Sequence, residues 1–316
     1  MTEKTAEIHT ETGLPAELPR LPRPDVRKKR RGDRREGRLL HNIYAMNKFM
    51  PYIMPERSDG CNTYADELDV TETDAFCKQM IAKGLTNFSF LHVMLAAYVR
   101  TLSQKPAVNR FVAGRRIYAR NNIEFVMVVK KEMTAESPDT CIKVAFEPDD
   151  TVQEVYERFN RAVEEVKATQ ALDSDFDKTA DRLANQPRFI LKGIVRLLNW
   201  LDYHGWLPEA FLKVSPFHGS MIITSMGSLG IKPIYHHIYN FGTLPVFISY
   251  GVKRSMVKIK RDGTTESRKY IDIKVVTDER ICDGFYYASA FKMIRRFVEH
   301  PDALTVRPDR IVADVE

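Results

Sequence analysis

The sequence contains no run of 18 or more uncharged apolar residues, the shortest stretch expected of a membrane-spanning helix. Its first residues, MTEKTAEIHTETGLP, are polar and lack the apolar core of a secretory signal peptide. Because both features are missing, we expect a soluble, cytoplasmic protein.

Cysteine is also scarce, with four residues in 316, and none of them forms a C-x-x-C pair. Hydrophobic residues make up 44% of the chain, so a large core can form without disulfide cross-links. We therefore expect reduced thiols at all four positions, which are Cys61, Cys77, Cys141 and Cys282.

Signatures of metal and phosphate sites are missing too. The glycine-containing stretch GSMIITSMGSLG, residues 219–230, has neither the G-x-x-x-x-G-K nor the G-x-G-x-x-G order of a phosphate-binding loop. Four histidines of the second half fit no zinc-binding spacing, so no metal site is expected among them. They are His204, His218, His236 and His237.

The net charge of +6 is concentrated near the N-terminus, where residues 27–38 read RKKRRGDRREGR and hold eight basic residues in twelve. Such a run could attract the phosphates of nucleic acid, anionic lipid or coenzyme A. No aromatic residue is interleaved for base stacking, so we favour a solvated, flexible arm.

Residues 1–24 are rich in Pro, Glu and Thr and favour a disordered leader. We therefore predict that residues 1–38 form a Pro-rich leader and basic arm. Residues 39–316 contain no internal repeat and no Pro/Ala-rich hinge, so we predict that they form one folded domain.

Apolar periodicity predicts the elements of the first half. Residues 71–83 favour a helix that ends at Gly84, residues 90–102 a short buried helix, and residues 152–166 a third helix with apolar residues three and four apart. Residues 123–129 and 140–146 are typical of strands.

The stretch PRFILKGIVRLLNWLDYHGWLPEAFLK, residues 187–213, alternates large apolar residues with charged ones at helical period. We favour a pair of helices packed on the core, and keep a membrane-surface helix as the alternative.

The rest of the second half is rich in strands, at residues 221–224, 245–252, 256–260 and 268–277. The last two are joined through Asp262-Gly263, a strong hairpin signal, and an apolar-striped helix follows over 283–298. Helices and strands in mixed order, with neighbouring antiparallel strands, predict an α+β sandwich.

The segment TDERICDGFYYASAF, residues 277–291, resembles the H-x-x-x-D-G strand-turn-helix motif of chloramphenicol acetyltransferases and of the catalytic domains of dihydrolipoyl acyltransferases. When Asp283 and Gly284 are aligned with the motif, Asp278 and Glu279 occupy the positions of the paired histidines. The catalytic histidine of these families is therefore replaced by Glu279.

Two further segments are similar to the same families. SPFHGSMIITSMG, residues 215–227, resembles the segment that supplies a hydroxyl to the oxyanion of the tetrahedral intermediate, and Thr224 and Ser225 occupy that place. Residues 68–110 resemble the first two helices and the turn after them. The spacing between the three segments also agrees with that of the families.

The resemblance implies a two-layer sandwich of the coenzyme A-dependent acyltransferase type, with a mixed sheet and helices on one face. It also implies a homotrimer with the active site in a channel between subunits, and coenzyme A or acyl-CoA as a substrate. In the families the motif's aspartate pairs with an arginine, for which Arg34, Arg35 and Arg38 are the candidates here. The 38 residues before the predicted domain are too few for a lipoyl domain.

Acyl transfer from a thioester to a thiol or hydroxyl acceptor requires a base poised near neutral pH and a donor aimed at the oxyanion. Histidine meets the first need better than glutamate, although burial can raise the pKa of a carboxyl group. Two hypotheses stay open: an acyltransferase whose base is Glu279, or a non-catalytic trimer that binds an acyl thioester or partners. His237 is a candidate replacement base, and Gly284 is expected to allow close packing or a special backbone angle.

Overall fold

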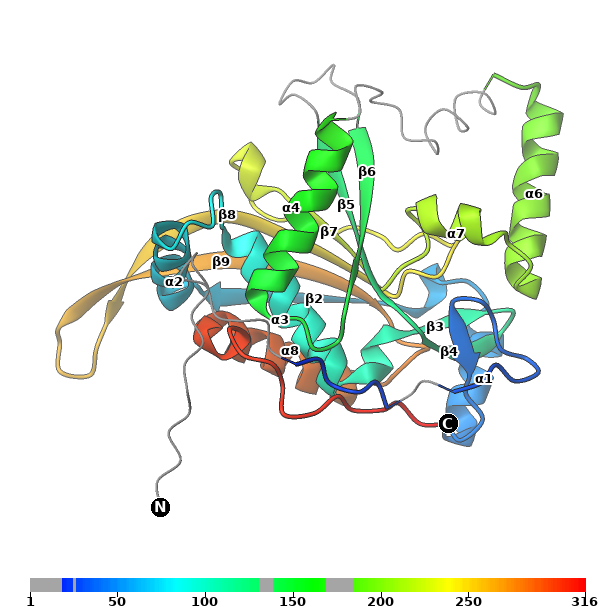
Figure 1. Ribbon diagram of the computed structural model, residues 1–316, viewed down its shortest axis with the longest axis horizontal. Coiled ribbons are helices and arrows are strands. Elements are labelled where there is room, and N and C mark those ends of the chain that lie inside the picture. The colour runs from blue at the N-terminus through cyan, green and yellow to red at the C-terminus, as the bar shows by residue number, and fades with distance from the viewer. Residues whose placement is uncertain (1–18, 25–26, 131–138, 169–184) are drawn as a thin grey trace.

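The structure, a computed structural model, describes residues 19–24, 27–130, 139–168 and 185–316. A six-stranded mixed sheet lies at the centre of the described part (Figure 1). Its strands are β2 (Cys61–Asp69), β5 (Ile123–Lys130), β6 (Asp139–Phe146), β7 (Met221–Ser225), β8 (Val246–Ile259) and β9 (Thr265–Asp278).

The strands follow the order β2-β9-β8-β7-β5-β6. The short strand β7 pairs in parallel with both β5 and β8, and the remaining pairs are antiparallel. β8 and β9 form the predicted hairpin, in which Gly263 takes a φ of +81°, a left-handed conformation that suits glycine.

One face of the sheet carries the main core. It is covered by α2 (Thr71–Ala82), α3 (Phe90–Gln104), α4 (Val152–Ala168) and α8 (Gly284–Glu299). α3 contacts both α4 and α8, and its residues 93–99 are all buried, which explains why its sequence is apolar on every side. The predicted α+β sandwich with helices on one face of a mixed sheet is confirmed.

The opposite face of the sheet carries a smaller apolar cluster, in which the loop residue Ile238 packs on side chains of the strands. The strand members are Val126, Ile222, Phe247 and Val276, with Leu244 just before β8. Loop chain rather than helix therefore covers this part of the second face.

A second, three-stranded sheet is formed by β1 (Gly37–Leu39), β4 (Arg116–Arg120) and β3 (Arg110–Ala113), in that order. The helix α1 (Ala45–Ile53) follows β1 and contacts β4. This small sheet joins the N-terminal part of the described chain to the body.

The segment 27–38 is not the free arm that we predicted from its charge. Arg34 and Arg38 are both buried, and β1 begins within the segment, at Gly37. Arg38 donates to the carbonyls of Asp314 and Val315 at 2.9 and 2.8 Å. Strand β1 thus crosses the predicted boundary at residue 38. The leader residues 1–18 lie outside the described residues.

The stretch 187–213 forms two helices, as predicted, α6 (Arg188–His204) and α7 (Glu209–Val214). The expectation that they pack on the core is wrong for α6, because Asp202 is its one buried residue. In Figure 1 this helix stands at the right-hand edge, away from the helices that cover the sheet. None of the helices in the described ranges meets the length and apolarity needed to span a membrane.

Arg34 joins the N-terminal segment to α6. It donates to the Asp202 carboxylate at 2.7 Å and to the Asp202 carbonyl at 2.6 Å, while its Nε donates to Glu36 at 2.8 Å. Burial alone would raise the pKa of Asp202, but His218, Arg34 and Arg57 outweigh it and lower that pKa. The Arg34–Asp202 ion pair is thus the main polar contact that holds this segment to α6.

Arg34→Ala should lower the free energy of unfolding by about 3–5 kcal/mol, since it leaves the Asp202 carboxylate buried without its guanidinium. Urea unfolding measures the change. The matched control is Arg31→Ala, at an exposed position of the same basic segment, which should change stability by less than about 0.5 kcal/mol. Equal midpoints for Arg34→Ala and wild type would restore the free-arm interpretation.

Candidate functional site

Glu279 follows directly after the last residue of β9. Its backbone N–H donates to the Gly60 carbonyl at 2.8 Å, and its carboxylate accepts a 2.5 Å hydrogen bond from the amide of Asn62 on β2. The side chain is half-buried and its partner Asn62 is exposed. The carboxylate is therefore open to solvent and to a neighbouring surface.

Asp278, one residue earlier, is fully buried and held by two arginines. Arg280 forms a bidentate pair with its carboxylate at 2.8 Å for each hydrogen bond, and the Arg57 Nε lies 3.6 Å away. Burial lowers the pKa of Arg57, while the Asp278 charge opposes that effect. Where the resemblance places the first of two histidines, the chain has a buried ionic cluster.

This cluster fixes the surroundings of Glu279. Arg57 donates to the carbonyl of Tyr239 at 2.8 Å and to that of Gly242, and Arg280 donates to the carbonyls of Met54 and Pro55 at 3.1 and 3.2 Å. Three chain segments are therefore tied to the end of β9. Sequence reasoning missed Arg57 because its partners lie about 180 residues away along the chain.

Asp283 and Gly284 form the start of α8, as the strand-turn-helix motif predicts. The Asp283 carboxylate accepts from the backbone N–H of Tyr286 at 2.8 Å and caps the helix. The predicted pairing of Asp283 with Arg34, Arg35 or Arg38 is not found: Asp283 is exposed and bonds its own helix, while Arg34 and Arg38 bind elsewhere.

Gly284 does not have the close packing expected of it. A Cβ built at Gly284 meets nothing within 4 Å, and its φ is not positive. The next residue, Phe285, is 86% exposed. The turn beside Glu279 therefore presents a glycine and a large apolar side chain to the outside of the chain.

Thr224 and Ser225 end β7, and because they are consecutive strand residues their side chains point to opposite faces of the sheet. Met221 and Ile223 belong to the core under the helices, so Ser225 lies on that face. Ile222 belongs to the smaller cluster, which puts Thr224 on the other face. Of the two predicted hydroxyls, Ser225 lies on the side of α2 and α3.

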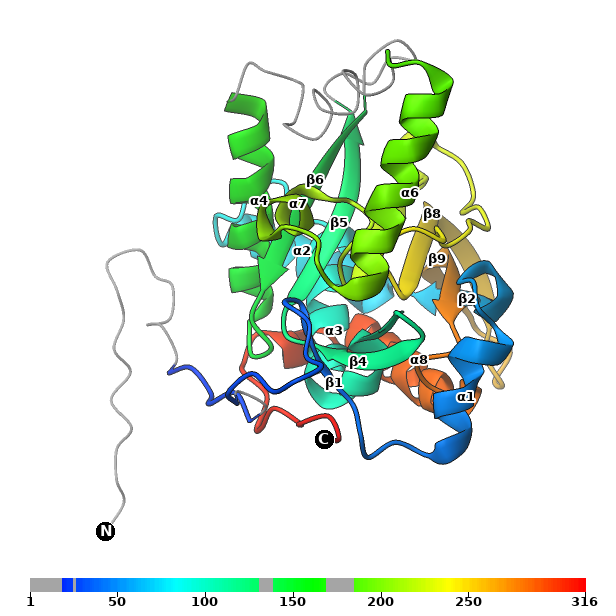
Figure 2. The same ribbon diagram turned by 90° about the vertical axis from the view of Figure 1, so that its right-hand side faces the viewer.

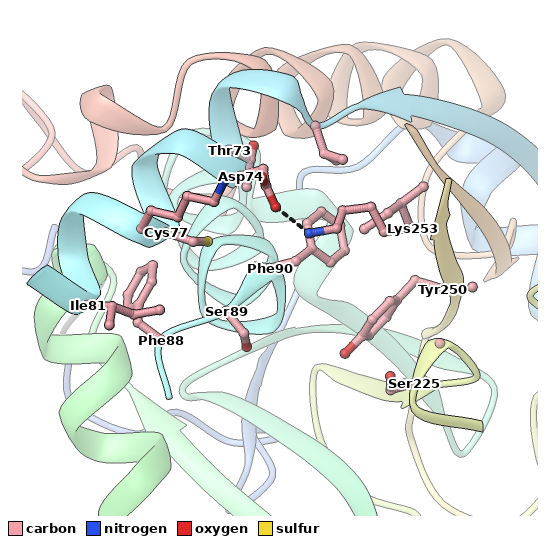
Figure 3. A pocket seen from close by; sticks show the side chains of 15 residues that line it. Thr73, Asp74, Cys77, Ile81, Phe88, Ser89, Phe90, Ser225, Tyr250 and Lys253 are labelled. Carbon is pink, nitrogen blue, oxygen red and sulfur yellow. Dashed lines mark hydrogen bonds and ion pairs between the residues drawn. The ribbon is translucent and has the colours of Figure 1, made fainter. Parts of the chain in front are cut away.

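Ser225 lines a pocket of about 360 Å³ between α2, the start of α3 and strand β8 (Figure 3). Apolar walls are formed by Ile81, Phe88, Phe90 and Tyr250, while Cys77 and Ser89 add a thiol and a hydroxyl. Burial raises the pKa of the Cys77 thiol to about 11 and also raises that of Tyr250, so both groups keep their protons near neutral pH.

The rim of this pocket is cationic. Asp74 accepts hydrogen bonds from Lys253 and Lys269, and the Lys78 ammonium lies 3.4 Å from the same carboxylate. Burial acts to raise the pKa of Asp74, but the two lysine hydrogen bonds outweigh it and hold that pKa well below its usual range. One carboxylate thus faces three ammonium groups, which leaves a net positive charge.

Two glycines allow the chain to close the floor of the pocket. A Cβ at Gly227 would lie 2.6 Å from the Gly251 carbonyl, and one at Gly251 would lie 2.4 Å from the Pro233 ring. Any larger residue would push β8 away from the segment after β7. The position of Ser225 against Tyr250 therefore depends on these two glycines.

His237 lies on the opposite face of the sheet from this pocket. Its exposed ring stacks on His236, whose ring in turn lies flat on Phe247 at 3.9 Å. Phe247 belongs to the smaller cluster, on the Thr224 side of the sheet. The structure does not bring His237 into the pocket that Ser225 lines.

His218 is the histidine with the most developed polar contacts. Its Nδ1 lies 2.8 Å from the Ser215 hydroxyl and its Nε2 lies 3.5 Å from the Asp202 carboxylate. The three residue types match a nucleophile triad, but Ser215 is completely buried. The set therefore serves as a polar anchor inside the fold.

Glu279 and the β7 hydroxyls do not meet within one chain. Thr224, Ser249 and Lys274 are neighbours across β7, β8 and β9, and Glu279 lies five residues beyond Lys274. At about 3.3 Å per residue and about 4.8 Å between strands, the separation is on the order of 15–20 Å. Neither Thr224 nor Ser225 can share a substrate atom with Glu279 of the same chain.

The described elements define an α+β sandwich: a mixed sheet, helices on one face, and an Asp-Gly turn that opens the last long helix. No protein-family model matches the chain, and no curated protein sequence matches it.

Solved structures do match, and they share this fold. A probable dihydrolipoamide acetyltransferase from Listeria monocytogenes is 15% identical, with a TM-score of 0.51 over 82% of this chain and 94% of that one. A chloramphenicol acetyltransferase is 11% identical, with a TM-score of 0.51 over 83% and 99% of the two chains. The truncated catalytic core of the 2-oxoacid dehydrogenase multienzyme complex from Thermoplasma acidophilum is 14% identical, with a TM-score of 0.50 over 83% and 99%.

Asp278→Asn should destabilise the protein by about 3–5 kcal/mol, because it leaves Arg57 and Arg280 buried without a counter-charge. Denaturant unfolding tests this. Asp272→Asn is the control: that carboxylate pairs with Arg254 in a partly exposed bridge, so its loss should change stability by about 0–1 kcal/mol. Similar effects of the two substitutions would contradict the central role of the buried cluster.

Proposed function

We propose that the protein is an acyltransferase that transfers an acyl group from a coenzyme A thioester to a thiol or hydroxyl acceptor. The observation that carries the proposal is the Ser225 hydroxyl in the wall of a pocket with apolar sides and a cationic rim. A coenzyme A thioester has matching features: an apolar acyl chain for the apolar walls, a polar carbonyl for the Ser225 hydroxyl, and a phosphate-bearing end for the cationic rim.

In the proposed complex the thioester carbonyl oxygen accepts from Ser225, with Tyr250 as the neighbouring protonated hydroxyl. The acceptor attacks the carbonyl carbon and its proton passes to a base. The C–S bond then breaks, and the coenzyme A thiolate leaves and takes up a proton. A hydroxyl that binds the oxyanion more strongly than the ground-state carbonyl accelerates both steps.

The lysines at the rim supply the charge that phosphates require. Lys253 and Lys78 are the more solvent-exposed of the three, with side chains 48% and 73% exposed, so phosphates can reach them from solution. Among the lining residues, Lys78 and Lys253 are positive and Asp74 is negative, so the rim keeps an excess of one positive charge, to which the nearby Lys269 adds. This excess favours a polyanionic ligand.

We propose Glu279 as the base, supplied to the pocket by a neighbouring subunit of a homotrimer. The separation of Glu279 from Ser225 within one chain supports this arrangement, as do the exposed Gly284 and Phe285 beside Glu279. A neighbouring surface over this turn would bury Phe285 and exclude water from the carboxylate.

A non-catalytic acyl-thioester-binding trimer is the second candidate. It is favoured by the hydrogen bond between Glu279 and Asn62, which occupies the carboxylate, and by the lower basicity of glutamate compared with histidine. The two candidates predict the same ligand and differ in turnover.

Ligand binding is tested first, by titration of coenzyme A into wild type and two lysine variants. Lys253→Ala should weaken binding by about tenfold or more, because it removes a charge-assisted contact at the rim. Lys258→Ala, at an exposed position further along β8, should leave the affinity unchanged. Equal affinities for all three proteins, or no binding at all, would reject the pocket.

Turnover is then measured as acyl transfer from acetyl-CoA to a thiol acceptor. Glu279→Gln should reduce the rate by about 10²- to 10⁴-fold with coenzyme A affinity preserved, and Glu279→His should restore or raise it. Activity that survives Glu279→Gln but is lost in His237→Ala would move the base to His237. Absence of turnover in wild type and Glu279→His, with coenzyme A still bound, would select the non-catalytic trimer.

The proposed assembly has its own test. Light scattering and sedimentation of the full chain should give a trimer or a multiple of three, and Phe285→Glu should shift it toward monomer because it places a charge in the proposed contact. A strict monomer that transfers acyl groups at the wild-type rate would rule out a site shared between subunits.

A further inference from the structure

The outer side of α6 carries an exposed strip of apolar and aromatic side chains. Phe189, Ile190, Leu197 and Trp200 lie on one flank of the helix and are between 37% and 76% exposed. Trp206, two residues after the helix, extends the strip and is 58% exposed. Exposed apolar patches of this kind mark a contact surface.

A row of positive charges runs beside the strip. Arg188, Lys192 and Arg196 follow one another at spacings of four residues, so they lie on one side of α6, and all three are exposed. The acidic residue of the same stretch, Asp202, is buried against Arg34 and His218. Residues 185–208 therefore have no exposed carboxylate, and the outward surface of α6 carries a net positive charge.

The orientation of this surface is fixed. Leu191, Ile194, Leu198 and Leu201 are half-buried at spacings of three and four, which makes them the inward side of α6. Asp202 fastens the last turn through Arg34, and a Cβ at Gly114 would touch the Tyr203 carbonyl, so the helix end sits tightly on the β3–β4 turn. In Figure 2, α6 lies on the side that faces the viewer.

We propose that this side of α6 docks on an anionic lipid surface. The apolar strip enters the interface between head groups and acyl chains, Arg188, Lys192 and Arg196 reach the lipid phosphates, and the two tryptophans lie at head-group depth. A lipid surface offers apolar and negatively charged groups side by side along the whole length of the helix. A second copy of this chain would need an acidic, apolar groove of matching length instead.

This inference is independent of the acyl-transfer proposal, since none of its residues lines the Ser225 pocket. A failure to bind coenzyme A would not affect the lipid-docking proposal, and a failure to bind lipid would not affect the acyl-transfer proposal.

The chain itself provides the reporter, because its two tryptophans, Trp200 and Trp206, both belong to this surface. Tryptophan emission of the full chain is recorded with vesicles of phosphatidylcholine and phosphatidylglycerol in equal parts, and with vesicles of phosphatidylcholine alone. We expect a blue shift and co-sedimentation with the anionic vesicles, weakened by added salt, and neither with the neutral ones.

The variant Lys192→Glu/Arg196→Glu keeps both tryptophans and should weaken partitioning onto anionic vesicles by at least about tenfold. The matched control is Lys258→Glu/Arg261→Glu, which makes the same change in net charge at exposed positions near the β8–β9 turn. It should bind like wild type. Thermal unfolding of both variants verifies that they are folded.

Three results would overturn the proposal. The first is an unchanged emission spectrum with anionic vesicles. The second is an equal loss of binding in the control variant, which would indicate attraction by net charge alone. The third is a blue shift that follows protein concentration without lipid, because a second copy of the chain would then cover the strip.

Discussion

The geometry of the candidate site depends on the buried ionic cluster around the Asp278 carboxylate. Two guanidinium groups, from Arg57 and Arg280, hold it at the end of β9. Through their remaining N–H groups these arginines bind carbonyls of the segments 54–55 and 239–242. The Tyr287 hydroxyl of α8 donates to the Asp278 carbonyl at 3.0 Å. Strand, helix and two loops therefore meet at one ion cluster.

The cluster also accounts for the different surroundings of Asp278 and Glu279, the two residues that the resemblance aligns with paired histidines. Because consecutive residues at the end of a strand point in opposite directions, one carboxylate is turned inward and the other outward. The inward one needs buried positive partners, which Arg57 and Arg280 provide. The outward one is left free of that ionic network and bonds a neutral amide. The end of β9 thus carries one buried carboxylate that holds the fold together and one that is partly open to solvent.

Local patterns in the sequence were sufficient for most elements of the fold. The helices at α2, α3, α4 and α8 and the β8–β9 hairpin lie where apolar period, capping residues and the Asp-Gly turn predict them. The motif correctly predicts a turn at Asp283. The predicted arginine partner of Asp283 is wrong, because the N-terminus of α8 offers a nearer hydrogen-bond donor, the backbone N–H of Tyr286.

Contacts between distant segments could not be read in the same way. Arg34 lies 168 residues before Asp202, and the run of basic residues around it is typical of a solvated arm. The ion pair between Lys253 and Asp74 joins residues 179 positions apart, and it forms because α2 packs beside β8. Periodicity also shows that α6 has an apolar side without showing what covers it. In each case the missing information is the partner, which local sequence does not contain.

Arg34 connects these observations. As part of a basic run it is typical of a solvated, flexible arm, yet its charge is used inside the fold to neutralise Asp202. Asp202 is the acidic residue of α6, and the pairing holds its carboxylate at the buried side of the helix, away from the apolar strip. With the carboxylate buried, the exposed side of α6 keeps only positive charge, from Arg188, Lys192 and Arg196. The same ion pair therefore fixes the helix to the body and sets the sign of the surface that the helix presents.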